Sequence, residues 1–224
     1  EEQPTFTPPS MPWLDGKIPE DAMKHLWEIM TNPIQEPLTN PLAGNISKSV
    51  FLQDKDNWFY ENVLKEMSEF FYFKDSWSNF FEIQITKKKP RPIFKLNLLW
   101  VNYQKQHEFN PPHHHQGGIG YSFVVFMKIP THWKDQHALE LSLNSNVPCA
   151  SDFQFLLGMA SQQVREISIP LCPEDKGRIL FFPSWLHHQV FPFYECEEER
   201  ITISGNIVLS SNKPSTTEEA CPEP

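Results

Sequence analysis

The sequence predicts a mainly β protein of the α+β class, with helices only in its N-terminal part. The first observation is a change of hydrophobic period near Ile83, from helical spacing before it to strand-like alternation after it. The second is that no helix-length segment separates the later strands, which argues against a parallel α/β sheet. A series of short strands separated by turns indicates a sandwich or barrel. The strands are expected at residues 93–103, 121–129, 139–143, 153–157, 164–169, 178–182, 188–193 and 200–209.

The N-terminal elements are expected to support this β core. Residues 1–19 contain five prolines and predict an extended arm anchored by Trp13 and Leu14. A helix is expected to begin at the last of these prolines, because the acidic residues that follow suit the positive end of a helix. Its apolar stripe comprises Ala22, Leu26, Ile29 and Met30. A short strand at 50–52 and a second helix capped by Asp56 should follow.

The chain is expected to form one domain over residues 1–224. Within it, 1–90 would be the arm and helical support, 91–209 the β core, and 210–224 a disordered acidic tail. The four cysteines lack CxxC spacing and are too sparse for a disulfide scaffold, so they indicate a reducing compartment. Without a secretion signal or an apolar stretch of membrane-spanning length, we expect a soluble, cytoplasmic protein.

The charge of the chain limits its partners. A formal net charge of −9 argues against a nucleic-acid partner, and no membrane partner is expected. The one local basic run, at residues 87–91, is more typical of a solvated loop than of a docking site. The sequence leaves open whether the chain is a monomer or a homodimer.

Three adjacent histidines form the most informative stretch of the sequence. They stand in FNPPHHHQGG, directly before a predicted strand. Side chains two apart on a strand face the same way, so His113 and His115 would share a face. A mononuclear metal site needs a third ligand, and His187 and His188 offer one 75 residues later. Three imidazoles also describe zinc hydrolytic sites.

An arginine in a later strand suggests an anion in the same place. Arg200, Thr202 and Ser204 would share one face of a strand, while Ile201 and Ile203 share the other. An arginine that points into a barrel keeps its charge, so its burial requires an anion such as a dicarboxylate.

At these residues the chain resembles the double-stranded β-helix dioxygenases that use Fe(II) and 2-oxoglutarate. It is most similar to sequences of this superfamily from marine bacteriophages, in which W-x-N is followed by F-N-P-x-H-x-H-x-G and then S-F-V. The matching residues here are 100–102, 109–117 and 122–124. A second block, FFPSWLxHQVxPFY and then ERIxxSGN, matches 181–194 and 199–206. This second block selects His188 over His187 as the distal ligand.

The resemblance implies a fold, a reaction and a set of site residues. The fold would be a double-stranded β-helix of the jelly-roll or cupin-like kind. The reaction would hydroxylate a prolyl or other protein side chain, or a small molecule, with release of succinate and carbon dioxide. The catalytic metal ligands would be His113, His115 and His188, holding Fe(II). Residues expected around 2-oxoglutarate are Arg200, Thr202, Ser122 and either Tyr103 or Asn102, with Phe126 at the pocket wall.

One position departs from the usual pattern of the superfamily. Its first motif is H-x-D, and His115 stands where the carboxylate would be. The phage-type sequences also carry H-x-H, so membership is not affected. Either His115 ligates directly to give a three-histidine site, or a water replaces the carboxylate. A neutral imidazole adds no negative charge, so iron binding should be weaker or redox-shifted.

Two other functions remain open at this point. One is a cupin-like metal enzyme without 2-oxoglutarate, which predicts no role for Arg200. The other is a noncatalytic structural or binding module of a phage particle. Arg200 could also be a surface residue paired with one of the glutamates at 197–199. Residues expected outside the site are His114 and His187 as exposed neighbours, His107, His132 and His137 on the surface, and Trp100, Trp185 and Phe181 in barrel packing.

Overall fold

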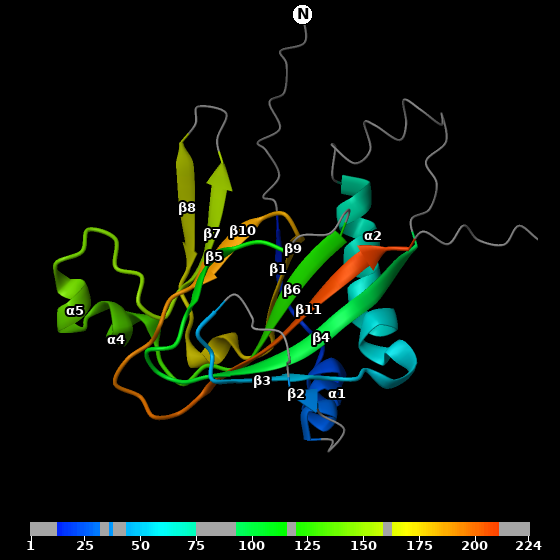
Figure 1. The fold of residues 1–224 in the computed structure, drawn as a ribbon, viewed down its shortest axis with the longest axis horizontal. Coiled ribbons are helices and arrows are strands. Elements are labelled where there is room, and N and C mark those ends of the chain that lie inside the picture. The colour runs from blue at the N-terminus through cyan, green and yellow to red at the C-terminus, as the bar shows by residue number, and fades with distance from the viewer. Residues whose placement is uncertain are drawn as a thin grey trace, which may run out of the picture.

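The computed structural model describes residues 13–31, 36–37, 44–74, 93–115, 120–158 and 163–210, and its strands form two antiparallel sheets (Figure 1). Eight strands make the β core: β4 (Phe94–Gln104), β5 (Asn110–His113), β6 (Gly120–Lys128), β7 (Phe153–Gly158), β8 (Val164–Ile169), β9 (Arg178–Pro183), β10 (His187–Val190) and β11 (Arg200–Leu209). Strands β4, β6, β9 and β11 belong to a seven-stranded sheet, and β5, β7, β8 and β10 form a four-stranded sheet.

The pairing of these eight strands is nested. β4 pairs with β11, β5 with β10, β6 with β9, and β7 with β8. A long antiparallel hairpin wound in this way into two sheets is a double-stranded β-helix, or jelly roll. The predicted mainly β fold class is therefore confirmed. The nesting also places β5 beside β10, and β4 beside β11, although the members of each pair are far apart in the sequence.

Helices cover one face of the seven-stranded sheet. α1 (Glu20–Thr31) and α2 (Lys65–Lys74), the latter preceded by a π-helical segment (Tyr60–Leu64), lie on the side away from β5, β7, β8 and β10 (Figure 1). The buried residues of α1 are Ala22, Leu26 and Met30, as the helical spacing predicts. They form one apolar cluster with residues of the sheet that include Val101, Phe123 and Ile203. The sheet is extended at its edges by β1 (Leu14–Lys17), β3 (Lys48–Phe51) and β2 (Glu36–Pro37).

A second apolar cluster packs the two sheets against each other. It includes Val124, Phe126, Leu180 and Phe182 from the seven-stranded sheet and Phe153 and Phe155 from the four-stranded sheet. Trp13 joins it, with its ring stacked on Phe155 at 4.5 Å between centroids. Strand β6 is therefore buried on both faces, since alternate side chains enter the two clusters. The predicted anchoring role of Trp13 agrees with this packing.

Residues 139–143 form a helix rather than the predicted strand. The structure has α5 (Glu140–Leu143) there, following α4 (Trp133–His137). Leu141 and Leu143 are 58% and 66% exposed. The alternation of leucines with polar residues therefore does not mark a buried strand face at this place.

The cap of the second helical segment is also different from the prediction. Asp54, not Asp56, accepts the backbone N–H of Phe59 at 2.9 Å through its Oδ2. Asp56 lies in the 3-10 turn Lys55–Asn57, with a positive φ of 59°. The chain thus makes one more turn before the helical segment than the spacing suggests.

Several predicted features lie outside the described residues. These are the arm before Trp13, the basic run at 87–91 and residues 211–224 of the predicted tail. Among the described ranges, no helix is long and apolar enough to cross a bilayer. The division of the chain into arm, core and tail stays a prediction.

Candidate metal centre

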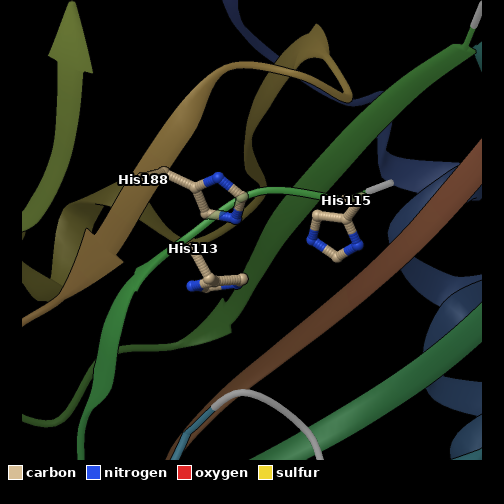
Figure 2. A group of neighbouring side chains, drawn as sticks. All are labelled: His113, His115 and His188. Carbon is tan, nitrogen blue, oxygen red and sulfur yellow. The ribbon is translucent and has the colours of Figure 1, made fainter. Parts of the chain in front are cut away.

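Three histidines from neighbouring segments converge beside a cavity between the sheets. The register of β5 and β10 makes His113 and His188 direct Cα partners. His115 follows β5, and its backbone N–H donates to the carbonyl of Ser184 at 2.9 Å, which ties this loop to the end of β9. Ligand atoms of the three side chains all lie within 4.8 Å of one another, and Figure 2 shows the three rings gathered in one place.

Backbone carbonyls determine which nitrogen two of these rings can offer. The Nδ1 of His113 lies 2.7 Å from the carbonyl oxygen of Pro111, and the Nδ1 of His188 lies 2.9 Å from that of Leu186. A carbonyl oxygen only accepts, so each Nδ1 carries the proton and donates it. The Nε2 lone pair of each ring is then left for another partner. A metal-binding histidine usually donates its other ring N–H in this way, to a carbonyl, a carboxylate or water.

The surroundings of the three rings favour their neutral form. Burial, reinforced by nearby His113, lowers the pKa of His188 well below its ordinary value. Burial likewise lowers the pKa of His113, and it lowers the pKa of His115 to about 4. Neutral imidazole is the form that coordinates metal ions.

The donor set fits a transition-metal ion. The ring centroids of His113 and His188 are 4.2 Å apart, and those of His115 and His188 are 5.4 Å apart. Three imidazole nitrogens suit iron, cobalt, nickel, copper and zinc rather than magnesium or calcium, which prefer oxygen ligands. His113, His115 and His188 could therefore hold such an ion together, with further positions open toward the cavity.

The cavity next to the histidines has a volume of about 360 Å³ and is bordered by strands of both sheets. Of the residues expected around a cosubstrate, it contains Asn102, Ser122, Phe126, Arg200 and Thr202. Ser204 faces it as well, whereas Ile201 and Ile203 pack into the helix-covered cluster. One face of β11 therefore borders the cavity and the other packs against the helix-covered cluster, as the alternation predicts.

Arg200 is buried at this cavity with part of its guanidinium unpaired. The residue is 1% exposed, and its Nη2 donates to the backbone oxygen and to the Oγ of Ser151, at 2.8 and 2.5 Å. The Nε and Nη1 atoms are buried and have no hydrogen-bond partner. Burial lowers the pKa of Arg200 to about 10, although Asp152 opposes this shift, and the group remains charged at neutral pH. Two unpaired, buried, charged donors fit an anionic ligand.

The surface alternative for Arg200 is wrong, because this side chain is buried and faces inward. Two of the three glutamates considered as its partners are engaged elsewhere. Glu198 pairs with Lys128 at 2.7 Å, and Glu197 accepts from the Nε2 of Gln106 at 2.6 Å.

The choice between Asn102 and Tyr103 follows from the faces of β4. Asn102 borders the cavity, and its Oδ1 accepts a hydrogen bond from the hydroxyl of Ser49 at 2.8 Å. This bond leaves the amide NH₂ group of Asn102 for other acceptors. Tyr103 packs against the apolar cluster on the opposite face, with Lys48 Nζ 4.1 Å from its ring centroid. The structure therefore brings Asn102, and not Tyr103, to the cavity.

Other aromatic and histidine predictions had mixed outcomes. His187 is exposed, as expected, but His114 is half-buried and borders the cavity, with its ring 4.5 Å from that of His187. His137 is not a free surface residue, because its Nε2 lies 3.0 Å from Oδ1 of the buried Asp152. Trp185 is 61% exposed and does not belong to the barrel packing.

Sequence reasoning missed the two residues that act on Arg200, Ser151 by hydrogen bonds and Asp152 by its charge. Ser151 and Asp152 are both buried directly before β7. Burial raises the pKa of the Asp152 carboxyl, while the charge and hydrogen bond of His137 act in the other direction. Isolated serine and aspartate residues at the end of a loop carry no motif, so only the tertiary structure identifies them.

A second group of metal-binding residue types lies away from this cavity. His132, Cys172 and Glu174 also have ligand atoms within 4.8 Å of one another. Here the atoms are used by local structure. His132 Nδ1 accepts the backbone N–H of Lys134 at 3.1 Å, and the thiol of Cys172 donates to Asp175 Oδ2 at 3.3 Å.

Comparison with known proteins shows which family the β core resembles. The family model described as "Putative 2OG-Fe(II) oxygenase" matches residues 98–206, which run from β4 to β11 and contain the three histidines and Arg200. The β core of the chain is thus similar to the 2-oxoglutarate and Fe(II) oxygenase family, in agreement with the sequence resemblance. A bacteriophage origin stays a prediction. A search of curated proteins finds no match.

Solved structures with a similar fold are distant in sequence. The viral collagen prolyl hydroxylase of Paramecium Bursaria Chlorella virus-1, in its 2OG complex, is 12% identical, with 88% of this chain and 96% of that chain covered and a TM-score of 0.48. The Pseudomonas putida prolyl-4-hydroxylase is 12% identical, with 88% and 92% covered and a TM-score of 0.46. An oxidoreductase of the 2OG-Fe(II) oxygenase family from Burkholderia pseudomallei is 10% identical, with 88% and 85% covered and a TM-score of 0.47.

Proposed function

We propose that this protein is an Fe(II)- and 2-oxoglutarate-dependent dioxygenase that hydroxylates a prolyl or other protein side chain, or a small molecule, and releases succinate and carbon dioxide. The observation that carries this proposal is the content of one cavity. It combines three neutral histidines with a buried arginine that has two unpaired donors. The first group suits a transition metal, and the second suits a carboxylate.

Each side chain has a separate task in this proposal. The Nε2 atoms of His113 and His188, together with the ring of His115, would hold the ion. Iron with 2-oxoglutarate supplies the oxidising chemistry when both are bound. The guanidinium of Arg200 would bind the distal carboxylate of the cosubstrate through one of its two unpaired donors, Nε or Nη1.

Further cavity residues would orient the cosubstrate and exclude water from the reacting centre. The hydroxyl of Thr202 borders the cavity on the same strand face as Arg200 and can donate to the same carboxylate. The amide of Asn102, held by Ser49, offers a neutral donor. Phe126 and Phe182 form part of the apolar wall. A desolvated wall strengthens the charge-assisted contacts of the arginine.

The alternative functions explain fewer features of the cavity. A cupin-like metal enzyme without a keto acid gives Arg200 no task, yet burying an arginine with two unpaired donors is costly. A noncatalytic module would need neither the metal ligands nor the unpaired donors. The oxygenase proposal accounts for both features with one metal and one dicarboxylate.

The proposal is tested by succinate formation in air from 2-oxoglutarate and Fe(II). We expect wild-type protein to convert 2-oxoglutarate to succinate slowly without added substrate. Arg200→Ala should require a much higher 2-oxoglutarate concentration while it keeps its iron, because the arginine is not one of the proposed metal ligands. Wild-type protein that binds iron but forms no succinate would defeat the proposal, and an unchanged concentration dependence in Arg200→Ala would defeat the role of this residue.

A further inference from the structure

We propose that Ser151 is a positioning residue that orients the guanidinium of Arg200 for the distal carboxylate of 2-oxoglutarate. The inference rests on the proposed function and adds to it a residue outside the matched sequence motifs. Ser151 is fully buried and lies in the turn before β7, while Arg200 begins β11 in the other sheet. The contact therefore links the two sheets behind the cavity.

Two acceptors of one residue hold one end of the guanidinium. Both the backbone oxygen and the Oγ of Ser151 accept from Nη2 of Arg200. The ring of Phe193 lies 5.1 Å from the guanidinium carbon, so the planar group is also packed against an aromatic surface. With Nη2 held in this way, Nε and Nη1 are the donors that remain for a ligand. The Nε–H and the Nη1 group lie on opposite edges of the guanidinium, so each of them can donate to a carboxylate in its own direction.

The backbone of Ser151 adopts a conformation that side-chain-bearing residues rarely take. Its φ is +75°, in the left-handed region that favours glycine. Neighbouring contacts maintain it: the N–H of Ser151 donates to the carbonyl of Pro192 at 2.8 Å, and the N–H of Phe191 donates to that of Asp152 at 2.9 Å. Thr131 Oγ1 lies 3.2 Å from Ser151 Oγ. Strain of this kind persists where the surroundings determine it, and it is often found at ligand sites.

A neutral residue in this position has an electrostatic consequence. A carboxylate hydrogen-bonded to Arg200 would cancel the charge that an incoming anion needs, whereas a serine fixes the group without neutralising it. The nearby carboxylate of Asp152 acts on Arg200 through its charge but pairs its Oδ1 with the Nε2 of His137. Ser151 can therefore orient Arg200 and leave its positive charge for the cosubstrate.

The test compares two 2-oxo acids on Co(II)-loaded protein by calorimetry. 2-Oxoglutarate has the distal carboxylate that Arg200 would bind, and pyruvate lacks it. We expect wild-type protein to prefer 2-oxoglutarate. Ser151→Gly should bind 2-oxoglutarate about tenfold more weakly, since it loses one acceptor for a charged donor. Its affinity for pyruvate should not change, and its melting temperature should not fall, because glycine accepts the positive φ.

Two further variants complete the design. Ser151→Ala removes the same hydroxyl without relieving the backbone, and it should show the same loss of selectivity. Ser68→Ala removes another fully buried serine hydroxyl, one that donates to the carbonyl of Leu64 in the helical layer, and it should leave both affinities unchanged.

The outcomes separate this inference from the proposed function. A wild-type protein without preference for 2-oxoglutarate over pyruvate would overturn the proposed function. A wild-type preference that survives in both Ser151 variants would overturn only the role of Ser151. An equal loss of both 2-oxo acids in these variants would assign Ser151 a merely structural role and would also overturn it.

Discussion

Two clusters in this molecule contain metal-binding residue types at similar spacing, and they differ in what their ligand atoms already do. In the cavity, the Nδ1–H groups of His113 and His188 each donate to a backbone carbonyl, which leaves the Nε2 lone pair of each ring free. In the second cluster, the Nδ1 of His132 accepts a backbone N–H, and the thiol of Cys172 donates to a carboxylate.

The two clusters also differ in how deeply they are buried and in what lies beside them. His188 is buried, and its cluster shares a cavity with an arginine that has two unpaired donors. Glu174 is exposed, and His132 and Cys172 are only partly buried. Proximity of ligand residues is therefore not sufficient. A metal centre needs lone pairs that converge after the other bonding groups of the ligands have been satisfied.

The largest expected effect comes from removing the buried histidine. His188→Gln should weaken Co(II) binding by more than about a hundredfold, since even outer-sphere partners are worth about 10–100-fold in affinity. Metal stoichiometry by mass spectrometry or calorimetry would measure the loss. The matched variant His132→Gln should retain one equivalent of Co(II). If His132→Gln lost the metal and His188→Gln kept it, the assignment of the two clusters would be reversed.

A smaller effect is expected when a carboxylate is introduced at the position where the family usually has one. His115→Asp adds a negative charge beside the ion, so Fe(II) should bind about tenfold more tightly, provided that this side chain faces the metal. Anaerobic competition with a chelator would measure the affinity. His114→Asp places the same charge on the adjacent residue and should give a smaller gain. Equal gains in the two variants would indicate a general charge effect and no direct ligation by His115.

The smallest effect concerns the thiol of the second cluster. Burial and hydrogen bonds to Glu174 and Asp175 raise the pKa of Cys172 to about 11. Because the thiolate is the reactive form, alkylation of Cys172 should be slow at pH 8 and should accelerate up to about pH 11. Asp175→Asn should increase the rate at pH 9 severalfold, as followed by peptide mass spectrometry. Zn(II) should not protect Cys172, and strong protection by one equivalent would contradict the contrast between the clusters.

Much of the fold was predictable because strands buried on one or both faces leave a clear pattern. Predicted and observed bounds are the same for β8 (164–169) and β11 (200–209), and the bounds of β4, β6 and β9 differ from the prediction by at most one residue at each end. The strand predicted at 139–143 was wrong, because so short an alternation does not distinguish an exposed helical turn from a strand. The helix cap was assigned two residues too late, since both Asp54 and Asp56 suit a cap chemically.

The site was predictable only where spacing or a motif carries the information. The alternation around Arg200 could be read from strand geometry. His113 and His115 do meet, but β5 ends at His113, so a loop and not a strand face brings His115 to the site. His113 meets His188 because β5 pairs with β10. The motif resemblance predicted that these two histidines act together, whereas composition alone does not. Ser151 and Asp152 had no signal, because their role depends on a contact across the sheets and on an unusual backbone conformation.

Anaerobic titration of the Fe(II) protein with 2-oxoglutarate tests the central claim most directly. Chelation of the iron by the keto acid produces a metal-to-ligand band in visible light. The account predicts that this band saturates at one equivalent per iron in wild-type protein, and that His188→Gln does not develop it. Absence of the band in iron-loaded wild-type protein would contradict the assignment of this cavity to Fe(II) and 2-oxoglutarate.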